Sequence, residues 1–479
     1  MTAPITKTLS GPERHLALRF SYGLTPSLRR DVRRLGASAW FERQLSPRRI
    51  SDRSADDLAA WWPSLARGPL DLWQRTQNEV EPGWQVMEDY QRWVLMRRIT
   101  SKRQLLEIMA EFWENHLHVP TDADGVFTHR VSYGKALRAG ALGKFSDLLF
   151  TATTHPAMGI YLNNAESTAE HPNENLGREL LELHTVGVGH HSEDDVKDSA
   201  RILTGWRVDV WKTFAASYSP ADHATGSVRV LGFKDSNRHR DGRQLTRRYT
   251  DYLASHPETA QRIARRLAVK FVRDDPPQSL VNALAKTYLK HDTAIVPVLE
   301  ALVASPVFAA SRGTKVRDPG EDVIATWRAL KVKARKPLSP ESGAESILWQ
   351  TADLGARPFS WPRPDGAPIT NAAWASTGRM TGSWRMHYAM AGGWWPRNEL
   401  VYKSAKSWLP EKKLRFDDLV EHLSQELLSR PATTQLTDAC CQAVGVRQST
   451  RIDKEHAVVQ WQMPLLLTTL LDSPAHMTR

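Results

Sequence analysis

Apolar residues recur at helical spacing along most of the chain, and this pattern constrains the fold more than any other feature of the sequence. Residues 103–117, 143–153, 259–272 and 417–429 all place apolar side chains at positions i, i+3, i+4 and i+7. Leu, Ala, Arg and Glu fill most other positions, and these residues favour helix. The sequence therefore predicts a mainly α fold, organised as a single large helical domain over residues 1–479.

Three segments interrupt the helical pattern. Residues 207–245 contain short β-prone runs separated by turn residues, which predicts an irregular insertion with a small β-hairpin. Residues 331–346 are polar and include two prolines, which is typical of a mobile linker. Residues 354–376 are rich in proline and glycine, and we expect them to form an ordered loop.

The cysteine content and the hydropathy pattern limit where the protein works. Its only two cysteines, Cys440 and Cys441, are adjacent, so the chain has no disulfide framework, which suits a reducing compartment. No stretch approaches the roughly 20 apolar residues of a membrane helix. The first residues lack the apolar run of a secretory signal. We expect a cytoplasmic protein without a membrane span.

The chain is basic and rich in tryptophan. Its net charge of +11 includes clusters at residues 28–34 and 237–249 that could meet phosphate groups. No nucleic-acid recognition motif accompanies them, so we expect the clusters to be arginine-rich helix surfaces rather than a nucleic-acid site. The 18 tryptophans favour packing between helices, with stacking on sugars or bases as the alternative.

The densest group of polar side chains lies in residues 171–184, HPNENLGRELLELH. Asn173 is a good helix cap, and Glu174 and Arg178 stand one turn apart. A well-capped helix explains most of this segment. It does not explain the number of amides at the start of the helix, where anions bind, nor the carboxylate of Glu179 at the edge of the apolar face. We expect Arg178 to be buried between its carboxylate partners.

A second polar pattern occupies the helix expected at 103–118. His116 lies in its apolar stripe, and a buried histidine needs a hydrogen-bond partner. We expect that partner to be Asn175 or Glu179, which would join the two motifs. The opposite stripe holds three carboxylates and a histidine: Glu107, Glu111, Glu114 and His118. Because no known metal-binding spacing is present, we interpret this stripe as a solvated acidic face.

Two long motifs carry a family resemblance. PNENLGRELLELHTVG (172–187) and GHHSEDDVKDSARILTGW (189–206) resemble the central motifs of the bacterial family called domain of unknown function 1800. Residues 137–164 and 259–277 also resemble this family, so the resemblance covers nearly the whole chain. It implies one family domain and no established activity. Many relatives carry export signals and are encoded beside a sulfatase-like protein of the alkaline-phosphatase class, which is therefore a candidate partner.

The chain departs from the family pattern at four positions. Glu114 replaces a histidine, Ala224 an acidic residue, Val228 a lysine and His184 an aromatic residue. If relatives use the first three for a site, that site is altered here. We therefore expect no stoichiometric zinc or iron in the purified protein.

These patterns leave two hypotheses open. The first is an enzyme acting on a polar or anionic substrate. Its proton-transfer residues would be Glu174, Glu179, His116 and His223. Its substrate-binding residues would be Asn173, Asn175, Arg178 and Asn115.

The second hypothesis is a non-catalytic accessory protein that works with a partner enzyme, in which the polar motifs hold helices in register. Convergence of the candidate residues around one pocket would favour an enzyme, and scatter would favour an accessory protein. The sequence specifies no cofactor.

Overall fold

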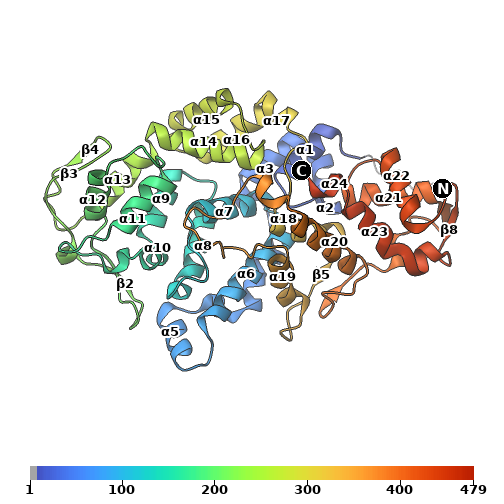
Figure 1. The fold of residues 1–479 in the computed structure, drawn as a ribbon, viewed down its shortest axis with the longest axis horizontal. Coiled ribbons are helices and arrows are strands. Elements are labelled where there is room, and N and C mark those ends of the chain that lie inside the picture. The colour runs from blue at the N-terminus through green and yellow to red at the C-terminus, as the bar shows by residue number, and fades with distance from the viewer. Residues whose placement is uncertain (1–7) are drawn as a thin grey trace.

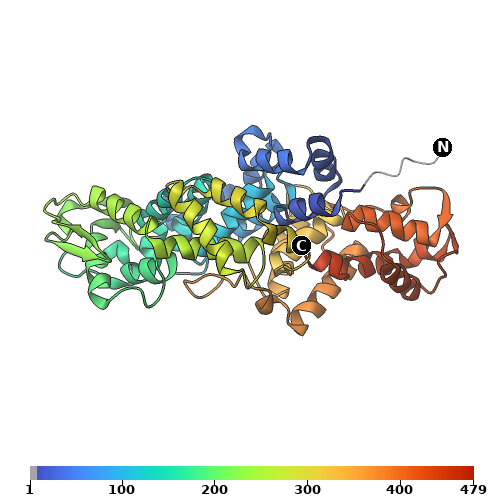
Figure 2. The ribbon, with the colours of Figure 1, turned by 90° about the horizontal axis from the view of Figure 1, so that it is seen from above.

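The computed structural model describes residues 8–479 and confirms the mainly α fold. The described part of the chain contains 24 α-helices and four two-stranded antiparallel sheets. The molecule is elongated: the chain starts in the middle, runs to one end, returns to the middle and then forms the other end (Figures 1 and 2). One continuous apolar core includes side chains from α1 to α23. No helix within residues 8–479 is long and apolar enough to cross a membrane.

The first helices build the middle of the molecule (Figure 1). They are α1 (Gly11–Arg19), α2 (Pro26–Leu35), α3 (Ala37–Leu45), α4 (Arg53–Asp56), α5 (Pro69–Gln77), α6 (Gly83–Thr100), α7 (Gln104–His116) and α8 (Arg130–Gly140). A Ser10–Glu13 capping box starts α1. Gly36 lies between α2 and α3 with a φ of 82°. Glycine suits this position, because such a backbone conformation is strained for residues that carry a Cβ atom.

The chain then forms the end of the molecule that carries the hairpins. The helices there are α9 (Phe145–Thr154), α10 (Pro156–Tyr161), α11 (Glu174–Glu179), α12 (Glu193–Ile202) and α13 (Arg243–Ala254). A π-helical turn, Leu180–His184, continues α11. The strands are β1 (Trp206–Val208), β2 (Ala216–Tyr218), β3 (Val228–Val230) and β4 (Phe233–Asp235). β1 pairs with β2 and β3 with β4, which matches the irregular β-hairpin segment predicted at 207–245.

Four helices return the chain along one long side to the middle (Figure 1). They are α14 (Pro257–Phe271), α15 (Gln278–Lys290), α16 (Ile295–Ala304) and α17 (Pro306–Ala310). α18 (Pro319–Ala329) then packs against α6, α19 (Gly343–Asp353) and α20 (Thr377–Ala391). β5 (Lys333–Ala334), inside the segment predicted to be a linker, pairs with β6 (Leu400–Val401).

The last helices form the opposite end of the molecule. They are α21 (Phe416–Leu428), α22 (Thr434–Val444), α23 (Met463–Leu471) and α24 (Pro474–Met477), with β7 (Lys413–Arg415) paired to β8 (Arg451–Asp453). The end of the chain returns to α1, where the Arg19 guanidinium donates to the carbonyl oxygens of Ser311 and Arg479 (2.7 and 2.9 Å).

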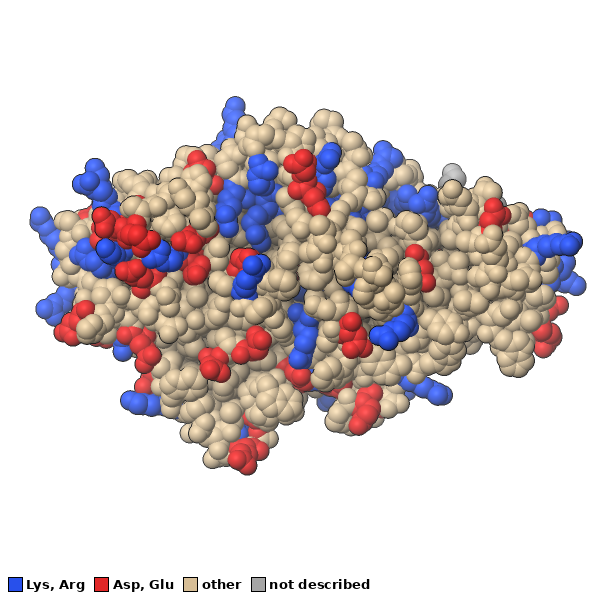
Figure 3. Space-filling view, viewed as in Figure 1, with Lys and Arg blue, Asp and Glu red and all other residues tan. Residues whose placement is uncertain are grey.

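Charged side chains of both signs are interspersed over the face seen in Figure 3. Blue and red groups lie side by side, most densely at the end that carries the β3–β4 hairpin. The net charge of +11 therefore coexists with neighbouring carboxylates on this face.

Candidate functional site

A pocket of about 80 Å³ lies in the middle of the molecule, between helices and the Pro/Gly-rich loop 354–376. α6, α7, α14 and the start of α18 supply its charged wall, and the loop supplies much of its apolar wall. The lining side chains include Arg98, Glu111, Phe112, Asn115, Lys270, Asp318, Phe359, Ile369 and Trp374. Its apolar surface with a few converging polar groups resembles that of small-molecule sites, but its volume is well below the roughly 300–1,000 Å³ of a typical ligand pocket and suits only a very small ligand.

Lys270 is the centre of the charged wall. Its Nζ lies 2.9 Å from Glu321 Oε1 and 3.9 Å from carboxylate oxygens of both Glu111 and Asp318. Burial lowers the pKa of this buried ammonium group, but Glu321 and Glu111 outweigh burial and raise the pKa above its usual value. Lys270 therefore carries a permanent positive charge into the pocket.

Asp318 is the group in this wall whose charge changes nearest to neutral pH. It caps α18, and its Oδ1 accepts a hydrogen bond from the Glu321 backbone N–H (2.8 Å). Burial, with the neighbouring carboxylates of Glu321 and Glu111, raises the pKa of Asp318 to about 6. Glu321 itself stays ionised, because Arg479 and Lys270 outweigh its burial and lower its pKa to about 2.

Glu111 completes the wall from α7. Its carboxylate accepts a hydrogen bond from the Tyr22 hydroxyl (2.7 Å) and one from Arg98 Nη1 (2.9 Å). Burial raises the pKa of Tyr22 well above its usual value, so the phenol remains a donor. These two contacts fix the Glu111 carboxylate at the edge of the pocket.

Asn115 fastens the loop over the pocket. Its side-chain amide accepts from the Ala367 backbone N–H (2.7 Å) and donates to the Ala367 carbonyl oxygen (2.8 Å). At Gly366, φ is +75° and a Cβ atom would lie 2.1 Å from the Asn115 carbonyl oxygen, so only glycine fits there. The predicted substrate-binding residue Asn115 thus lines the pocket, but its amide is bonded to the loop.

The acidic stripe of α7 is buried, so the prediction of a solvated face is wrong. Glu107 pairs with Arg97 and Arg138 at 2.5 and 2.7 Å. Glu114 accepts from Arg130 Nη1 (2.9 Å) and the Tyr90 hydroxyl (2.7 Å). Arginines from α6 and α8 neutralise these carboxylates. The sequence of α7 alone could not predict this, because the arginines belong to other helices.

The motif at 171–184 lies away from the central pocket and forms an accessible ion ladder. Arg178 pairs with Glu174 (3.2 Å) and with Glu193 of α12 (2.7 Å), and about a third of its side chain is exposed, at 32%. The prediction that Arg178 is buried is therefore wrong. Asn173 caps α11 by accepting from the Asn175 backbone N–H, as predicted, and Asn175 itself is exposed.

Glu179 stands at the edge of the same helix. It is half-buried, and burial, together with nearby Glu182, raises its pKa. It does not line the central pocket.

His116 is buried as predicted, but the predicted partner is wrong. Its Nε2 donates to the His184 carbonyl oxygen (3.0 Å) rather than to Asn175 or Glu179. Burial, with Arg266 nearby, lowers the pKa of His116 well below its usual value, so the ring is neutral. The contact joins the two motifs at the end of the π-helical turn after α11, where the carbonyl of the last residue has no partner within the helix.

His223 is enclosed in the hairpin region. Its ring nitrogens lie 3.1 Å from the Thr204 carbonyl oxygen and 3.0 Å from Asn237 Oδ1. A Cβ atom at Gly242 would meet the ring at 2.2 Å, so the imidazole fills its space. Ala224 and Val228 are both buried beside it. His223 therefore holds the hairpins to α12 and α13.

The four predicted proton-transfer residues do not converge at the pocket. Glu174, Glu179, His116 and His223 all lie outside its lining. The charged residues that do converge there include Lys270 and Asp318, which the sequence motifs did not single out. The sequence could have indicated Lys270, because it lies in the apolar stripe of residues 259–272 and a buried lysine is costly unless it is paired.

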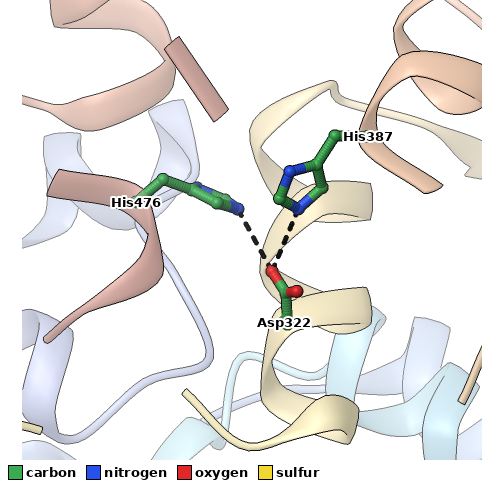
Figure 4. A group of neighbouring side chains, drawn as sticks. All are labelled: Asp322, His387 and His476. Atoms are coloured by element: carbon green, nitrogen blue, oxygen red, sulfur yellow. Dashed lines mark hydrogen bonds and ion pairs between the residues drawn. The ribbon is translucent and has the colours of Figure 1, made fainter. Parts of the chain in front are cut away.

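A second polar group is buried near the pocket. Asp322, His387 and His476 converge from α18, α20 and α24, as Figure 4 shows. Burial lowers the pKa of His387, but the carboxylates of Asp322 and Asp472 outweigh it and raise the pKa to about 9. In the absence of an ion this ring is positively charged.

The fold and the central motifs together define a family. Residues 15–478 match the family model described as a protein of unknown function, DUF1800. The chain therefore belongs to this family, as the resemblance of its motifs implies. No curated protein and no solved structure matches the chain.

Proposed function

We propose that the protein is an enzyme that binds a small molecule in the central pocket and moves a proton on it. The observation that carries this proposal is the wall where the Lys270 ammonium lies within 3.9 Å of three carboxylates. Clusters of titratable groups with shifted pKa values at a pocket are typical of catalytic sites. The scatter of Glu174, Glu179, His116 and His223 favours an accessory role for residues 171–184, so the enzyme hypothesis now rests on the pocket wall and not on that segment.

Asp318 is the proposed proton-transfer group. A pKa of about 6 lets its carboxyl group accept and release a proton near neutral pH, which is what general acid–base catalysis requires. Lys270 would stabilise negative charge that develops on the substrate. Phe112, Ile369 and Trp374 would bind an apolar part of the same molecule, so we infer a compact substrate with an apolar body and a polar head.

The test compares three proteins mixed with the small-molecule fraction of a cell extract. Mass spectrometry would follow which compounds are bound or consumed by the wild type, by Asp318→Asn and by Asp241→Asn. Asparagine preserves the cap of α18, so the first variant should fold. Asp241 is an exposed aspartate that does not line the pocket, so Asp241→Asn is the matched control.

We expect the wild type and Asp241→Asn to consume the same compound and Asp318→Asn to bind it without consuming it. Equal consumption by Asp318→Asn, or no compound bound by any of the three, would contradict the proposal.

An accessory role is the second candidate, because aromatic side chains are exposed on and after α20. Trp384, Tyr388 and Trp394 are all exposed, and the rings of Tyr388 and Trp394 are 4.8 Å apart. Such residues are enriched at interfaces. The family resemblance suggests a sulfatase-like partner for this surface. If Trp384→Ala and Trp394→Ala together abolish co-elution with such a partner while the pocket variant retains it, the accessory role is favoured.

A cytoplasmic location remains part of the proposal. Both cysteines, Cys440 and Cys441, are free thiols, and this agrees with a reducing compartment.

A further inference from the structure

Three buried side chains from distant parts of the chain converge one helical turn beyond Asp318. Asp322 belongs to α18, His387 to α20 and His476 to α24, and their ligand atoms all lie within 4.8 Å of one another. In Figure 4 both imidazole rings point their nitrogens toward the same carboxylate. We propose that Asp322, His387 and His476 bind one divalent transition-metal ion, for which zinc is the best fit. This site is independent of the proposed reaction in the pocket.

The separations of the ligand atoms fit a single ion. His387 Nε2 lies 3.1 Å from Asp322 Oδ1, and His476 Nε2 lies 3.7 Å from the same oxygen. A tetrahedral zinc ion with bonds of about 2.0–2.1 Å would place its ligand atoms roughly 3.3 Å apart. Both distances to Asp322 Oδ1 are thus within a few tenths of an ångström of this value, and the two imidazole nitrogens lie within 4.8 Å of each other.

The surroundings of Asp322 leave one oxygen for this role. Its Oδ2 accepts hydrogen bonds from Ser383 Oγ (2.8 Å) and from Arg379 Nη2 (3.2 Å). Its Oδ1 faces the two imidazole rings (Figure 4). The carboxylate is thus oriented to bind through a single oxygen, and it is fully buried, so water does not compete freely for it.

His387 is held by a further carboxylate behind it. Its Nδ1 lies 2.7 Å from Asp472 Oδ1, while Nε2 faces Asp322. A carboxylate that accepts from the outer nitrogen of a histidine is the usual support of metal-binding imidazoles, because it fixes the ring and increases its basicity. The same two contacts also suit a doubly protonated imidazolium between Asp322 and Asp472, so the observation that points to an ion is the approach of His476 Nε2 to the same Asp322 oxygen.

The ligand set selects the class of ion. Two imidazole nitrogens and one carboxylate oxygen suit zinc and other first-row transition metals better than magnesium or calcium, which prefer oxygen. Thr326, one turn after Asp322, places its hydroxyl 3.2 Å from His476 Nε2, so this hydrogen bond would have to break for Nε2 to bind the ion. The site would cross-link α18, α20 and α24.

This proposal replaces the expectation of a protein without zinc or iron. That expectation considered only the family positions occupied by Glu114 and Ala224, and none of the three residues of the present cluster. The competing arrangement is a positively charged His387 between Asp322 and Asp472, with a proton in place of the metal. A metal titration separates the two arrangements.

The experiment uses the full chain after chelator treatment and buffer exchange. Zinc would be added and bound metal measured by mass spectrometry, with the melting temperature followed in parallel. We expect about one zinc per chain, a higher melting temperature, and a visible absorption band typical of tetrahedral nitrogen–oxygen ligands when cobalt replaces zinc.

Two variants locate the metal. His476→Gln should lose the bound metal and the cobalt band. The double variant His190→Gln/His191→Gln removes two histidines outside the cluster, the exposed His190 beside Glu258 and the largely enclosed His191 beside Glu182, and should keep both. If the wild type retains no zinc, or if the His190/His191 variant loses it while His476→Gln keeps it, the proposal is overturned. The wild-type stoichiometry decides the outcome even if His476→Gln fails to fold.

Discussion

The contribution of a single charged residue to the stability of this protein depends on how deeply it is buried. Arg130 is fully buried, and donates to Glu114 (2.9 Å) and to the Val119 carbonyl oxygen (2.8 Å). Arg178 makes three ion pairs, but at the surface, where water screens them. The same guanidinium group should therefore contribute very differently at the two positions.

Arg130→Met should lower the free energy of unfolding by about 3–5 kcal/mol, because it leaves the Glu114 carboxylate buried without its partner. Arg178→Ala, the matched control, should cost less than about 1 kcal/mol. Urea unfolding followed by circular dichroism measures both. Similar losses in the two variants would mean that burial does not set the strength of these pairs.

At the scale of elements, the loop 354–376 is an ordered cover whose position depends on α7 and the residues just after it. Thr121 donates its backbone N–H to the Phe359 carbonyl oxygen (2.9 Å), and His118 Nε2 donates to the Trp361 carbonyl oxygen (2.9 Å). With the Asn115 amide, these contacts hold the loop at several points. Further contacts come from α6, where Gln91 Nε2 donates to the Pro358 carbonyl oxygen, and from Lys315, whose Nζ donates to the Ile369 carbonyl oxygen, so several segments fix the loop.

Asn115→Ala should release the loop at Ala367, since it removes one donor and one acceptor. We expect faster hydrogen exchange at the Ala367 amide and a loss of about 1–3 kcal/mol of stability. Asn175→Ala, at an exposed asparagine, is the control and should leave that amide protected. Unchanged exchange in Asn115→Ala would show that the other contacts suffice to hold the loop.

At the scale of the whole molecule, apolar periodicity predicted the helices but not which of their side chains come into contact. The helices α7, α14 and α21 lie where apolar spacing placed them, because that spacing reflects one buried face. The charged wall could not be predicted, since Glu111, Lys270 and Asp318 are far apart in sequence. Short-range patterns instead drew attention to residues 171–184, where the polar density turned out to be a capped surface helix.

The dependence of folding stability on pH is also a property of the whole molecule, to which Asp89 should contribute. Burial raises the pKa of Asp89 from 3.8 to about 6, although Ser64 and Arg92 donate hydrogen bonds to it. A raised carboxyl pKa means that the folded state binds the proton more tightly. The stabilisation is therefore full below pH 4 and lost as pH rises to about 6, at most about 3 kcal/mol.

Asp89→Asn should remove this loss of stability with rising pH. The difference in unfolding free energy between wild type and variant should therefore change between about pH 4 and about pH 6. Asp241→Asn should not, because hydrogen bonds from Arg243 hold the pKa of Asp241 at about 2. Urea titrations at several pH values measure the slopes. Parallel slopes for wild type and Asp89→Asn would contradict the prediction.

The spacing of Asp318 and Asp322 on α18 has an evolutionary consequence. The two carboxylates stand four residues apart, one facing the pocket and the other facing the two histidines. One residue inserted between them would turn the second carboxylate by about 100° around the helix axis. Descendants of this chain can therefore alter the pocket and the histidine cluster by substitution, whereas an insertion between Asp318 and Asp322 would turn the two sites away from each other.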